Sequence, residues 1–296
     1  MVIIMAKRFA AHILAYNCEK LLHLAINNCA PFVEKIYIAY SSAPWTYNAN
    51  ARQMSRNTVT KDFINTSKHI HKIEIIEGLW DTEEDQRNAC LAQAKTDGMD
   101  YLIIQDADEF YSEEDYKQNL SDIEKNPYYD LYTTPWYSFW KTLDYVIIGK
   151  NNEMIIGYPQ FAINCHKNVK FNRCRFIETK SIYQLAGLCF HLSYVLSDEE
   201  VLEKISIWGH SQQFDFKKWY KRKWEYWDES SVNLHPIYPD SWKKAIPFKG
   251  NLPSVLVDFI SPPLKIKKMN LFDTACFLFE DSFICLKKAI RKVLNK

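Results

Sequence analysis

The sequence predicts an α/β fold in which a mostly parallel central sheet is flanked by helices. Short apolar segments alternate with amphipathic ones through the first half of the chain, and strands that alternate with helices in this way form parallel sheets. After residue 126 the segments become aromatic, strand-like and interrupted by Pro and Gly, which predicts a smaller antiparallel portion. The 296 residues are enough to bury a large core without disulfides or a structural metal.

Hydrophobic periodicity gives the expected order of the elements. Strands are expected at residues 9–16, 33–40, 70–77 and 101–105, with helices at 18–30 and 82–96. Later strands are expected within 131–148, 153–176 and 188–195, followed by helices at 198–208 and 216–227. Ligands bind beyond the carboxyl ends of the strands in such sheets, so polar residues directly after the first four strands are candidate site residues.

The chain divides into a main domain, residues 1–263, and a C-terminal segment, residues 264–296. In this segment apolar residues recur at four- and three-residue steps and basic residues gather at the end, which predicts an amphipathic helix and completes a set of C-terminal helices. Two interpretations stay open. The helix docks on the main domain or on a second subunit, or it lies on an anionic membrane surface.

Composition excludes several functions and indicates a compartment. A formal charge of +1 gives no strongly basic face for nucleic acid. With 7 glycines, the chain contains neither G-x-G-x-x-G nor a P-loop. The eight cysteines include no C-x-x-C pair, which favours free thiols in a reducing compartment. No signal peptide or membrane span is evident. We therefore expect a cytoplasmic protein, with peripheral contact to the inner face of a membrane left open.

The strongest chemical signal is the acidic string Asp106-Ala107-Asp108-Glu109, directly after the strand at 101–105. Carboxylates this close repel one another and need a cation. Mg²⁺ and Mn²⁺ take oxygen ligands and keep positions open for substrate phosphates. The motif therefore predicts a carboxylate–metal–diphosphate bridge. The alternative is that these acids only cap the helix that starts near Ser112.

This string resembles the D-x-D motif of GT-A-type glycosyltransferases, in particular those similar to family 2. The Gln86-Arg87-Asn88 string upstream and the Cys189–Tyr194 segment downstream are also similar to bacterial members associated with surface-polysaccharide assembly. The resemblance covers most of residues 9–250. It implies a GT-A-like, Rossmann-like fold and a nucleotide-sugar donor.

The resemblance also implies roles for individual residues. Ala15, Tyr16 and Asn17, which end the first strand, would bind the nucleotide. Asp106 would face the ribose or the waters of the metal, and Asp108 would ligate the metal.

Histidine and arginine candidates complete the implied donor site. His191 is expected as a further metal ligand, with a core histidine as the alternative and His210 as its rival. Arg87 is expected to reach the diphosphate, or else to pair with Glu83 or Glu84 at helical spacing.

An inverting enzyme also needs a carboxylate base to deprotonate the acceptor. Asp198 is the first candidate and Glu109 the second, with Glu199 beside Asp198. However, residues 197–200 also read as a capping box, with Ser197 as N-cap.

Two aromatic residues that follow the acidic string are expected on the acceptor side. Trp136 and Trp140 offer faces that suit a sugar ring, although the same residues would make a good core.

These observations together predict a metal-dependent glycosyltransferase that uses Mn²⁺ or Mg²⁺. It would move a sugar from a nucleotide-sugar donor, expected to be UDP-linked, to a saccharide or lipid-linked acceptor. Two alternatives stay open: a nucleotidyltransferase that acts on a sugar phosphate, and a non-catalytic carbohydrate-binding protein.

Overall fold

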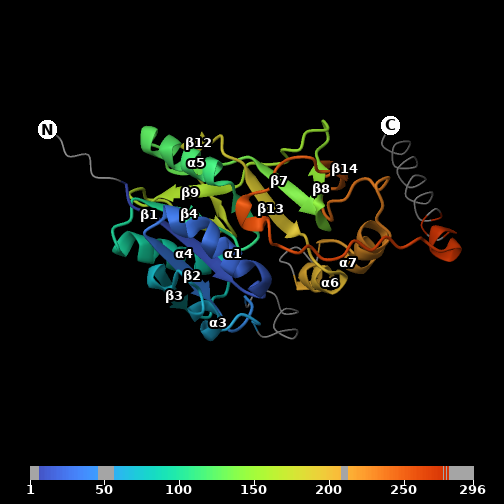
Figure 1. Ribbon diagram of the computed structural model, residues 1–296, viewed down its shortest axis with the longest axis horizontal. Helices are drawn as coiled ribbons and strands as arrows, with labels where there is room; N and C mark the ends of the chain where they lie inside the picture. The colour runs from blue at the N-terminus through green and yellow to red at the C-terminus, as the bar shows by residue number, and fades with distance from the viewer. Residues whose placement is uncertain (1–6, 46–56, 208–212, 276, 278, 280–296) are drawn as a thin grey trace, which may run out of the picture.

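The computed structural model describes residues 7–45, 57–207, 213–275, 277 and 279. Their strands form a seven-stranded sheet, in the order β12-β6-β9-β4-β1-β2-β3, a five-stranded sheet, in the order β14-β8-β7-β13-β5, and a two-stranded hairpin. The two larger sheets lie side by side in the molecule (Figure 1). The mixed α/β architecture, with a mostly parallel central part, agrees with the GT-A-like fold expected from the sequence.

Four adjacent parallel strands, which run from the middle of the first sheet to one edge, confirm the four strands predicted first. They are β1 (Phe9–Ala15), β2 (Lys35–Tyr40), β3 (Ile73–Glu77) and β4 (Tyr101–Ile104). All side chains of β4 are buried, as expected for an interior strand with both faces covered.

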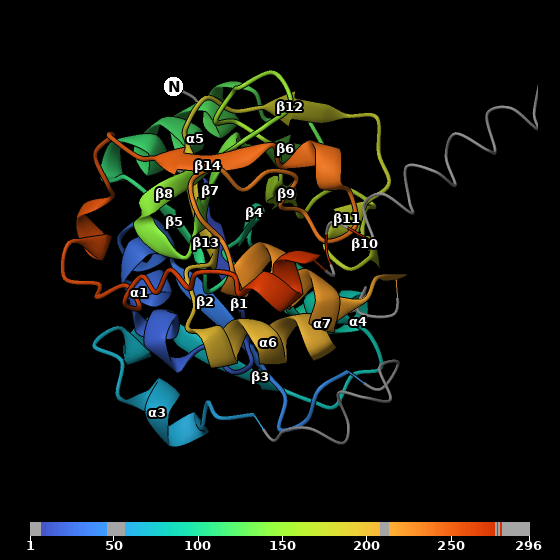
Figure 2. The same cartoon turned by 90° about the vertical axis from the view of Figure 1, so that its right-hand side faces the viewer.

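Helices cover both faces of this sheet. Helix α1 (Glu19–Cys29) packs its buried side chains against one face together with α5 (Glu113–Lys125), and α4 (Glu83–Thr96) covers the opposite face. Successive side chains of a strand point to opposite faces, which is why Ala11 and Ile13 join the core under α1 whereas Ala10 joins the core under α4. A short helix, α3 (Lys61–Asn65), precedes β3. The molecule is therefore layered, with its parallel sheet between helices (Figure 2).

The aromatic second half divides between the two sheets. Three of its strands extend the first sheet: β6 (Leu131–Thr133), β9 (Gln160–Asn164) and β12 (Ile182–Gln184). The second sheet contains β5 (Glu109–Tyr111), β7 (Trp136–Trp140), β8 (Thr142–Ile148), β13 (Cys189–Tyr194) and β14 (Lys244–Pro247). The hairpin is β10 (Phe171–Arg173) with β11 (Phe176–Ile177). The expected antiparallel portion is thus present, but part of it belongs to the central sheet.

The C-terminal third is helical and irregular. Helix α6 (Asp198–Ile207) is followed by α7 (Phe216–Trp219), which continues into a π-helical turn over Tyr220–Glu225. Residues 271–275 are helical. Residues 280–296, which hold most of the predicted amphipathic helix, lie outside the described residues, so docking, dimerisation and membrane contact through this helix stay predictions.

Two further expectations concern the whole chain. All six cysteines in the described part are free thiols: Cys18, Cys29, Cys90, Cys165, Cys174 and Cys189. None of the helices in the described part has both the length and the apolar character that crossing a bilayer would require.

A buried asparagine attaches α1 to the strand that follows the acidic string. The Asn28 amide donates to the carbonyl of Tyr111 at 2.8 Å, and its oxygen accepts from the Tyr111 N–H at 3.0 Å. Tyr111 belongs to β5, so this pair of bonds fixes the strand that starts directly after Asp108.

We expect Asn28→Ala to lower the free energy of unfolding by about 2–4 kcal/mol, because it leaves two buried backbone groups without a partner. Urea unfolding followed by circular dichroism measures this change. The matched control is Asn27→Ala, at the partly exposed neighbouring position of the same helix, which should cost less than about 1 kcal/mol. Equal losses in the two variants would contradict the role given to Asn28.

Candidate functional site

The acidic string forms the turn between the two sheets. Strand β4 ends at Ile104, and β5 begins at Glu109. The Glu109 N–H donates to the Asp106 carbonyl at 3.0 Å, and the Leu192 N–H donates to the Asp108 carbonyl at 2.7 Å. The turn therefore lies at the carboxyl end of a parallel strand, where ligands bind in such sheets, and β13 holds it from the other side.

Asp106 is held between two arginines. Its carboxylate lies 2.9–3.0 Å from the guanidinium of Arg87 and 3.0 Å from that of Arg175. Burial alone would raise the pKa of Asp106, but the two guanidinium groups outweigh burial and hold that pKa well below its usual range. Asp106 is therefore ionised and already neutralised by the protein itself.

Arg87 lies in α4 and is only 3 % exposed. It pairs with Glu83 at 2.8 Å, one helical turn earlier, as well as with Asp106. The expected pairing at i,i+4 spacing is confirmed for Glu83. Contact of Arg87 with a diphosphate stays a prediction.

Glu109 is fully buried and pairs with Arg175 through both carboxylate oxygens. Burial raises the pKa of Glu109 to about 7, although the Arg175 guanidinium opposes the rise. A base must reach the acceptor hydroxyl, and Glu109 has no exposed surface from which to do so. Its geometry is that of a residue that positions Arg175.

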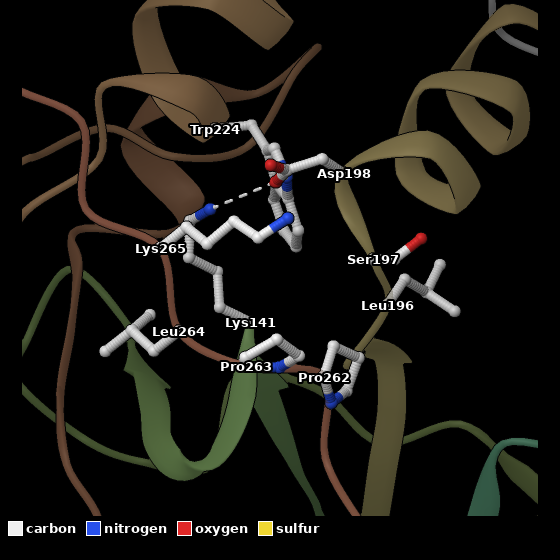
Figure 3. A pocket seen from close by; sticks show the side chains of 9 residues that line it. All are labelled: Lys141, Leu196, Ser197, Asp198, Trp224, Pro262, Pro263, Leu264 and Lys265. Carbon is white, nitrogen blue, oxygen red and sulfur yellow. Dashed lines mark hydrogen bonds and ion pairs between the residues drawn. The ribbon is translucent and has the colours of Figure 1, made fainter.

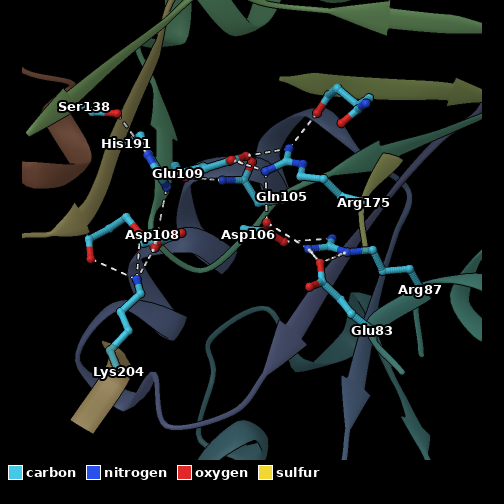
Figure 4. A network of polar contacts seen from close by, with 12 residues as sticks. Glu83, Arg87, Gln105, Asp106, Asp108, Glu109, Ser138, Arg175, His191 and Lys204 are labelled. Atoms are coloured by element: carbon cyan, nitrogen blue, oxygen red, sulfur yellow. Dashed lines mark hydrogen bonds and ion pairs between the residues drawn. The ribbon is translucent and has the colours of Figure 1, made fainter. Parts of the chain in front are cut away.

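Asp108 points to the opposite side of the turn from Asp106 (Figure 4). Its carboxylate oxygen Oδ2 lies 3.8 Å from Nε2 of His191, on β13, and 3.6 Å from Nζ of Lys204, on α6. The Lys204 ammonium donates to the carbonyl and the hydroxyl of Ser193 at 2.9 and 2.6 Å. Asp108 thus has cationic and imidazole neighbours but no direct hydrogen bond from either.

His191 is held as a neutral imidazole. Burial lowers its pKa to about 4, against the attraction of the Asp108 carboxylate. The ring lies flat on the indole of Trp136, with 4.2 Å between centroids and 8° between planes. Its Nδ1 lies 3.3 Å from the Ser138 hydroxyl. The contacts on Nδ1 and on the ring face leave Nε2 directed toward Asp108.

The fit to a divalent ion rests on these two residues. Among the described residues, no three His, Cys, Asp or Glu side chains come close enough to form a metal cluster. Asp108 and His191 can still share one ion, since ligands about 2.1 Å from the same Mg²⁺ lie at most about 4.2 Å apart. Mg²⁺ and Mn²⁺ prefer oxygen ligands and are usually held by one or two carboxylates plus substrate phosphates, so Asp108 fits as the carboxylate and His191 would add a nitrogen ligand beside it. Both oxygens of Asp106 face arginines, which makes Asp106 a support of the site.

The expected nucleotide-binding residues lie at the carboxyl end of β1. Asn57 bridges this end to the next strand, because its amide donates to the carbonyls of Ala15 and Ser41 at 2.7 and 2.8 Å. Asn17 has a left-handed backbone, with φ of 47°, and its N–H donates to Asn57 at 3.0 Å. Tyr16 is half-buried beside them. The arrangement forms an ordered edge, and base binding there stays a prediction.

The two tryptophans predicted on the acceptor side have different surroundings. Trp136 is partly exposed and stacks on His191, so it can still face a substrate. Trp140 is fully buried in a cluster with Tyr194, Trp219 and Trp224. The expectation for Trp140 is therefore corrected, because a side chain with no exposed surface cannot contact an acceptor.

Asp198 lies at the start of α6 and accepts a hydrogen bond from the Trp224 indole at 2.9 Å. The capping box is present: the Ser197 N–H donates to Glu200 at 2.7 Å, and the Glu200 N–H donates to the Ser197 hydroxyl at 3.2 Å. A role for Asp198 or Glu199 as the base stays a prediction. His210, the rival of His191, lies outside the described residues.

Sequence reasoning missed Arg175 and His12. Arg175 follows Cys174, whose left-handed backbone, with φ of 50°, turns the hairpin so that Arg175 enters the site while Arg173 stays exposed. Nothing in the sequence distinguishes these two arginines. His12 lies in the middle of β1, fully buried, and within the described part neither ring nitrogen has a hydrogen-bond partner.

Comparisons with known proteins show a partial likeness of fold. No family model matches the chain, and no curated protein matches it. Among solved structures, the chain is similar to S. aureus TarS residues 1–349, with 13 % identity and a TM-score of 0.41 over 67 % of this chain and 64 % of that one. A longer TarS structure gives 13 % identity and a TM-score of 0.39, with 67 % and 38 % covered.

A third similar structure is 4-diphosphocytidyl-2C-methyl-D-erythritol synthase from Anaerococcus prevotii. It has 13 % identity and a TM-score of 0.35, over 61 % of this chain and 89 % of that one. The chain thus matches less than two thirds of the length of either TarS structure.

Arg175→Met should lower the free energy of unfolding by about 3–5 kcal/mol, because it leaves the buried Glu109 carboxylate unpaired. The double variant Arg175→Met/Glu109→Gln should lose at least about 1 kcal/mol less free energy of unfolding than the sum of the losses in the two single variants. Chemical unfolding of the four proteins measures this coupling.

The control for this cycle is Arg173→Met, on the exposed side of the same hairpin, which should change stability by less than about 0.5 kcal/mol. Additive effects of the Arg175 and Glu109 substitutions would show that the two side chains do not interact.

Because His12 is buried, we expect the protein to lose stability in mild acid. Burial lowers its pKa to about 3, so the unfolded chain binds a proton below about pH 6.5 that the folded chain does not. Stability is lost as the pH falls through this window. Between pH 7 and pH 5, the wild type should lose about 2 kcal/mol more than His12→Leu.

Urea unfolding at several pH values measures the contribution of His12. The exposed His71 supplies the control, because His71→Leu should keep the pH dependence of the wild type. Identical pH profiles for the wild type and His12→Leu would contradict the prediction.

Proposed function

We propose that the chain is a metal-dependent glycosyltransferase that moves a sugar from a nucleoside-diphosphate donor to a saccharide or lipid-linked acceptor. The observation that carries this proposal is the pair of Asp108 and His191, with 3.8 Å between Oδ2 and Nε2. The pair lies at the carboxyl end of an interior parallel strand, where substrates of such folds bind. A UDP-linked donor is the expected form.

The two residues would hold Mn²⁺ or Mg²⁺ by different means. Asp108 supplies a charged oxygen. His191 supplies a nitrogen, and its imidazole is neutral, which is the form in which histidine binds a metal. The Ser138 hydroxyl at Nδ1 is the kind of outer contact that fixes the ring of a metal-binding histidine. When bound, the ion would stabilise the negative charge that develops on the departing nucleoside diphosphate.

The two arginines that pair with Asp106 also support the proposal. Arg87 and Arg175 neutralise Asp106 within the protein, so Asp108 is the carboxylate of the string that remains for a cation. Lys204, which reaches to within 3.6 Å of Asp108, offers an additional ammonium on the same side. A diphosphate would therefore meet positive charge from the protein as well as from the ion.

The acceptor is proposed to approach from the side of Trp136. The indole is partly exposed and stacked on His191, so a sugar ring packed against it would lie beside the donor. The neighbouring ends of β1 and β2, joined by Asn57, are the proposed place of the nucleotide.

A panel of nucleoside diphosphates with and without Mn²⁺ tests the metal bridge by thermal unfolding. One diphosphate, expected to be UDP, should raise Tm only when Mn²⁺ is present, with about 2.7 kcal/mol of stabilisation at a hundredfold excess over Kd. Asp108→Asn should remove this stabilisation. The exposed Asp240 provides the control, and Asp240→Asn should retain it.

The products of turnover separate glycosyl transfer from nucleotidyl transfer. Release of nucleoside diphosphate from a nucleotide sugar supports the proposal, and release of pyrophosphate from a nucleoside triphosphate opposes it. Stabilisation that is equal with and without Mn²⁺ would rule out the proposed metal bridge.

A further inference from the structure

A second polar pocket lies beyond the Asp108–His191 pair and uses none of the residues of that site. It is a small recess, open to solvent, between the end of β7, the start of α6, the π-helical turn and the segment at residues 262–265. Figure 3 shows the side chains of Lys141 and Lys265 reaching into it beside Asp198. One of its lining residues, Asp198, is also the candidate base expected from the sequence, but the proposed metal bridge uses none of them.

Lys141 is the most unusual residue of the pocket. Its side chain is only 5 % exposed. Its backbone is left-handed, with φ of 62°, and its N–H donates to the Tyr194 carbonyl at 2.8 Å. This bond ties Lys141 to the end of β13. The lysine is thus fixed by the backbone in a place where its long side chain is withdrawn from solvent.

The Lys141 ammonium lacks a hydrogen-bond acceptor among the described residues. Its Nζ lies 4.1 Å from the centre of the Trp224 ring and 3.9 Å from Oδ1 of Asp198, beyond hydrogen-bonding distance. That oxygen already accepts from the Trp224 indole at 2.9 Å. A buried cation is costly unless it is hydrogen-bonded as well as paired. Burial accordingly lowers the pKa of Lys141 to about 8, against the attraction of Asp198.

The balance of charge in the pocket is positive. Lys141 and Lys265 face the single carboxylate of Asp198. Of the charged groups around them, Lys267 is paired with Glu225 at 2.7 Å and so adds no net charge. One positive charge is left without a counterion in a recess whose other walls are largely apolar, and such a recess attracts a small anion.

We propose that this pocket binds an oxyanion, a phosphate or carboxylate group, carried by the acceptor. Lys141 would donate to it from the buried end and Lys265 from the exposed end. The walls formed by Leu196, Pro262 and Leu264 offer no donors, so they would limit the occupant to one small charged group. The assignment to the acceptor rests on the proposed glycosyl transfer, whereas binding of the anion does not.

The position of the pocket relative to His191 supports the assignment to the acceptor. Lys141 is bonded to Tyr194, three residues beyond His191 on β13, and a strand advances about 3.3 Å per residue. The backbone attachment of Lys141 thus lies about 10 Å along β13 from His191. An acceptor that used both places would carry its anionic group apart from the hydroxyl that receives the sugar.

Binding of inorganic phosphate to the full chain tests the pocket directly. Titrations followed by ³¹P NMR, at constant ionic strength because salt screens exposed charges, should give saturable binding to the wild type. Lys141→Met and Lys265→Met should each weaken this binding at least about fivefold. Lys268→Met, at an exposed position outside the pocket, should leave it unchanged. Acetate in place of phosphate shows whether a carboxylate is accepted as well.

Absence of saturable phosphate binding, or equal binding by the wild type and both pocket variants, would overturn the proposal. Lys265 is exposed, so Lys265→Met keeps the test valid even if Lys141→Met fails to fold. Asp108→Asn should keep phosphate binding, and Lys265→Met should keep the stabilisation by nucleoside diphosphate and Mn²⁺. If the wild type shows stabilisation by nucleoside diphosphate and Mn²⁺ but no phosphate binding, the anion pocket has failed. If it shows phosphate binding but no such stabilisation, the proposed metal bridge has failed.

Steady-state kinetics test whether the pocket takes part in acceptor binding. With a working donor, Lys265→Met should raise KM for phosphate-bearing acceptors and leave KM for neutral saccharides unchanged. The same rise for both kinds of acceptor would contradict an anion-binding role in acceptor recognition.

Discussion

The candidate site depends on the ion pairs that Asp106 makes with Arg87 and Arg175. These pairs join three separate parts of the chain: helix α4, the turn after β4, and the small hairpin β10–β11. Removal of one of these buried side chains would strongly destabilise the folded protein, because the charges of its former partners would stay buried and unpaired. The network therefore fixes the position of the turn more firmly than the apolar core alone would.

This arrangement gives the two aspartates of one short string different tasks. Asp106 is buried against cations that belong to the fold, whereas Asp108 is a quarter exposed on the other side of the turn. Glu109 extends the division, since it is fully buried and holds Arg175 in place. Two acids of the string thus secure the geometry of the third, which is the proposed metal ligand.

The order of strands and helices could be predicted from the sequence, because apolar periodicity reports local structure directly. The place of Asp108 and the pairing of Arg87 with Glu83 followed from short sequence spacings. The roles of Arg175 and His12 could not be predicted, and the sequence left open whether Trp140 would lie in the core or face an acceptor. Each depends on segments far apart in the chain: the turn at Cys174 brings Arg175 to the site, and the packing of α6 and α7 covers Trp140. Long-range packing, not local pattern, decides such positions.

The backbone contacts of the turn bear on how the site can move. The Asp108 carbonyl accepts from Leu192, and His191 lies opposite Glu109 in the antiparallel pairing of β13 with β5. Both proposed ligands are therefore mounted on one hydrogen-bonded ladder. A hinge motion between the two sheets would carry the pair along as a rigid unit. Any opening or closing around a substrate has to come from elements outside that ladder, such as α6, which reaches Asp108 through the side chain of Lys204.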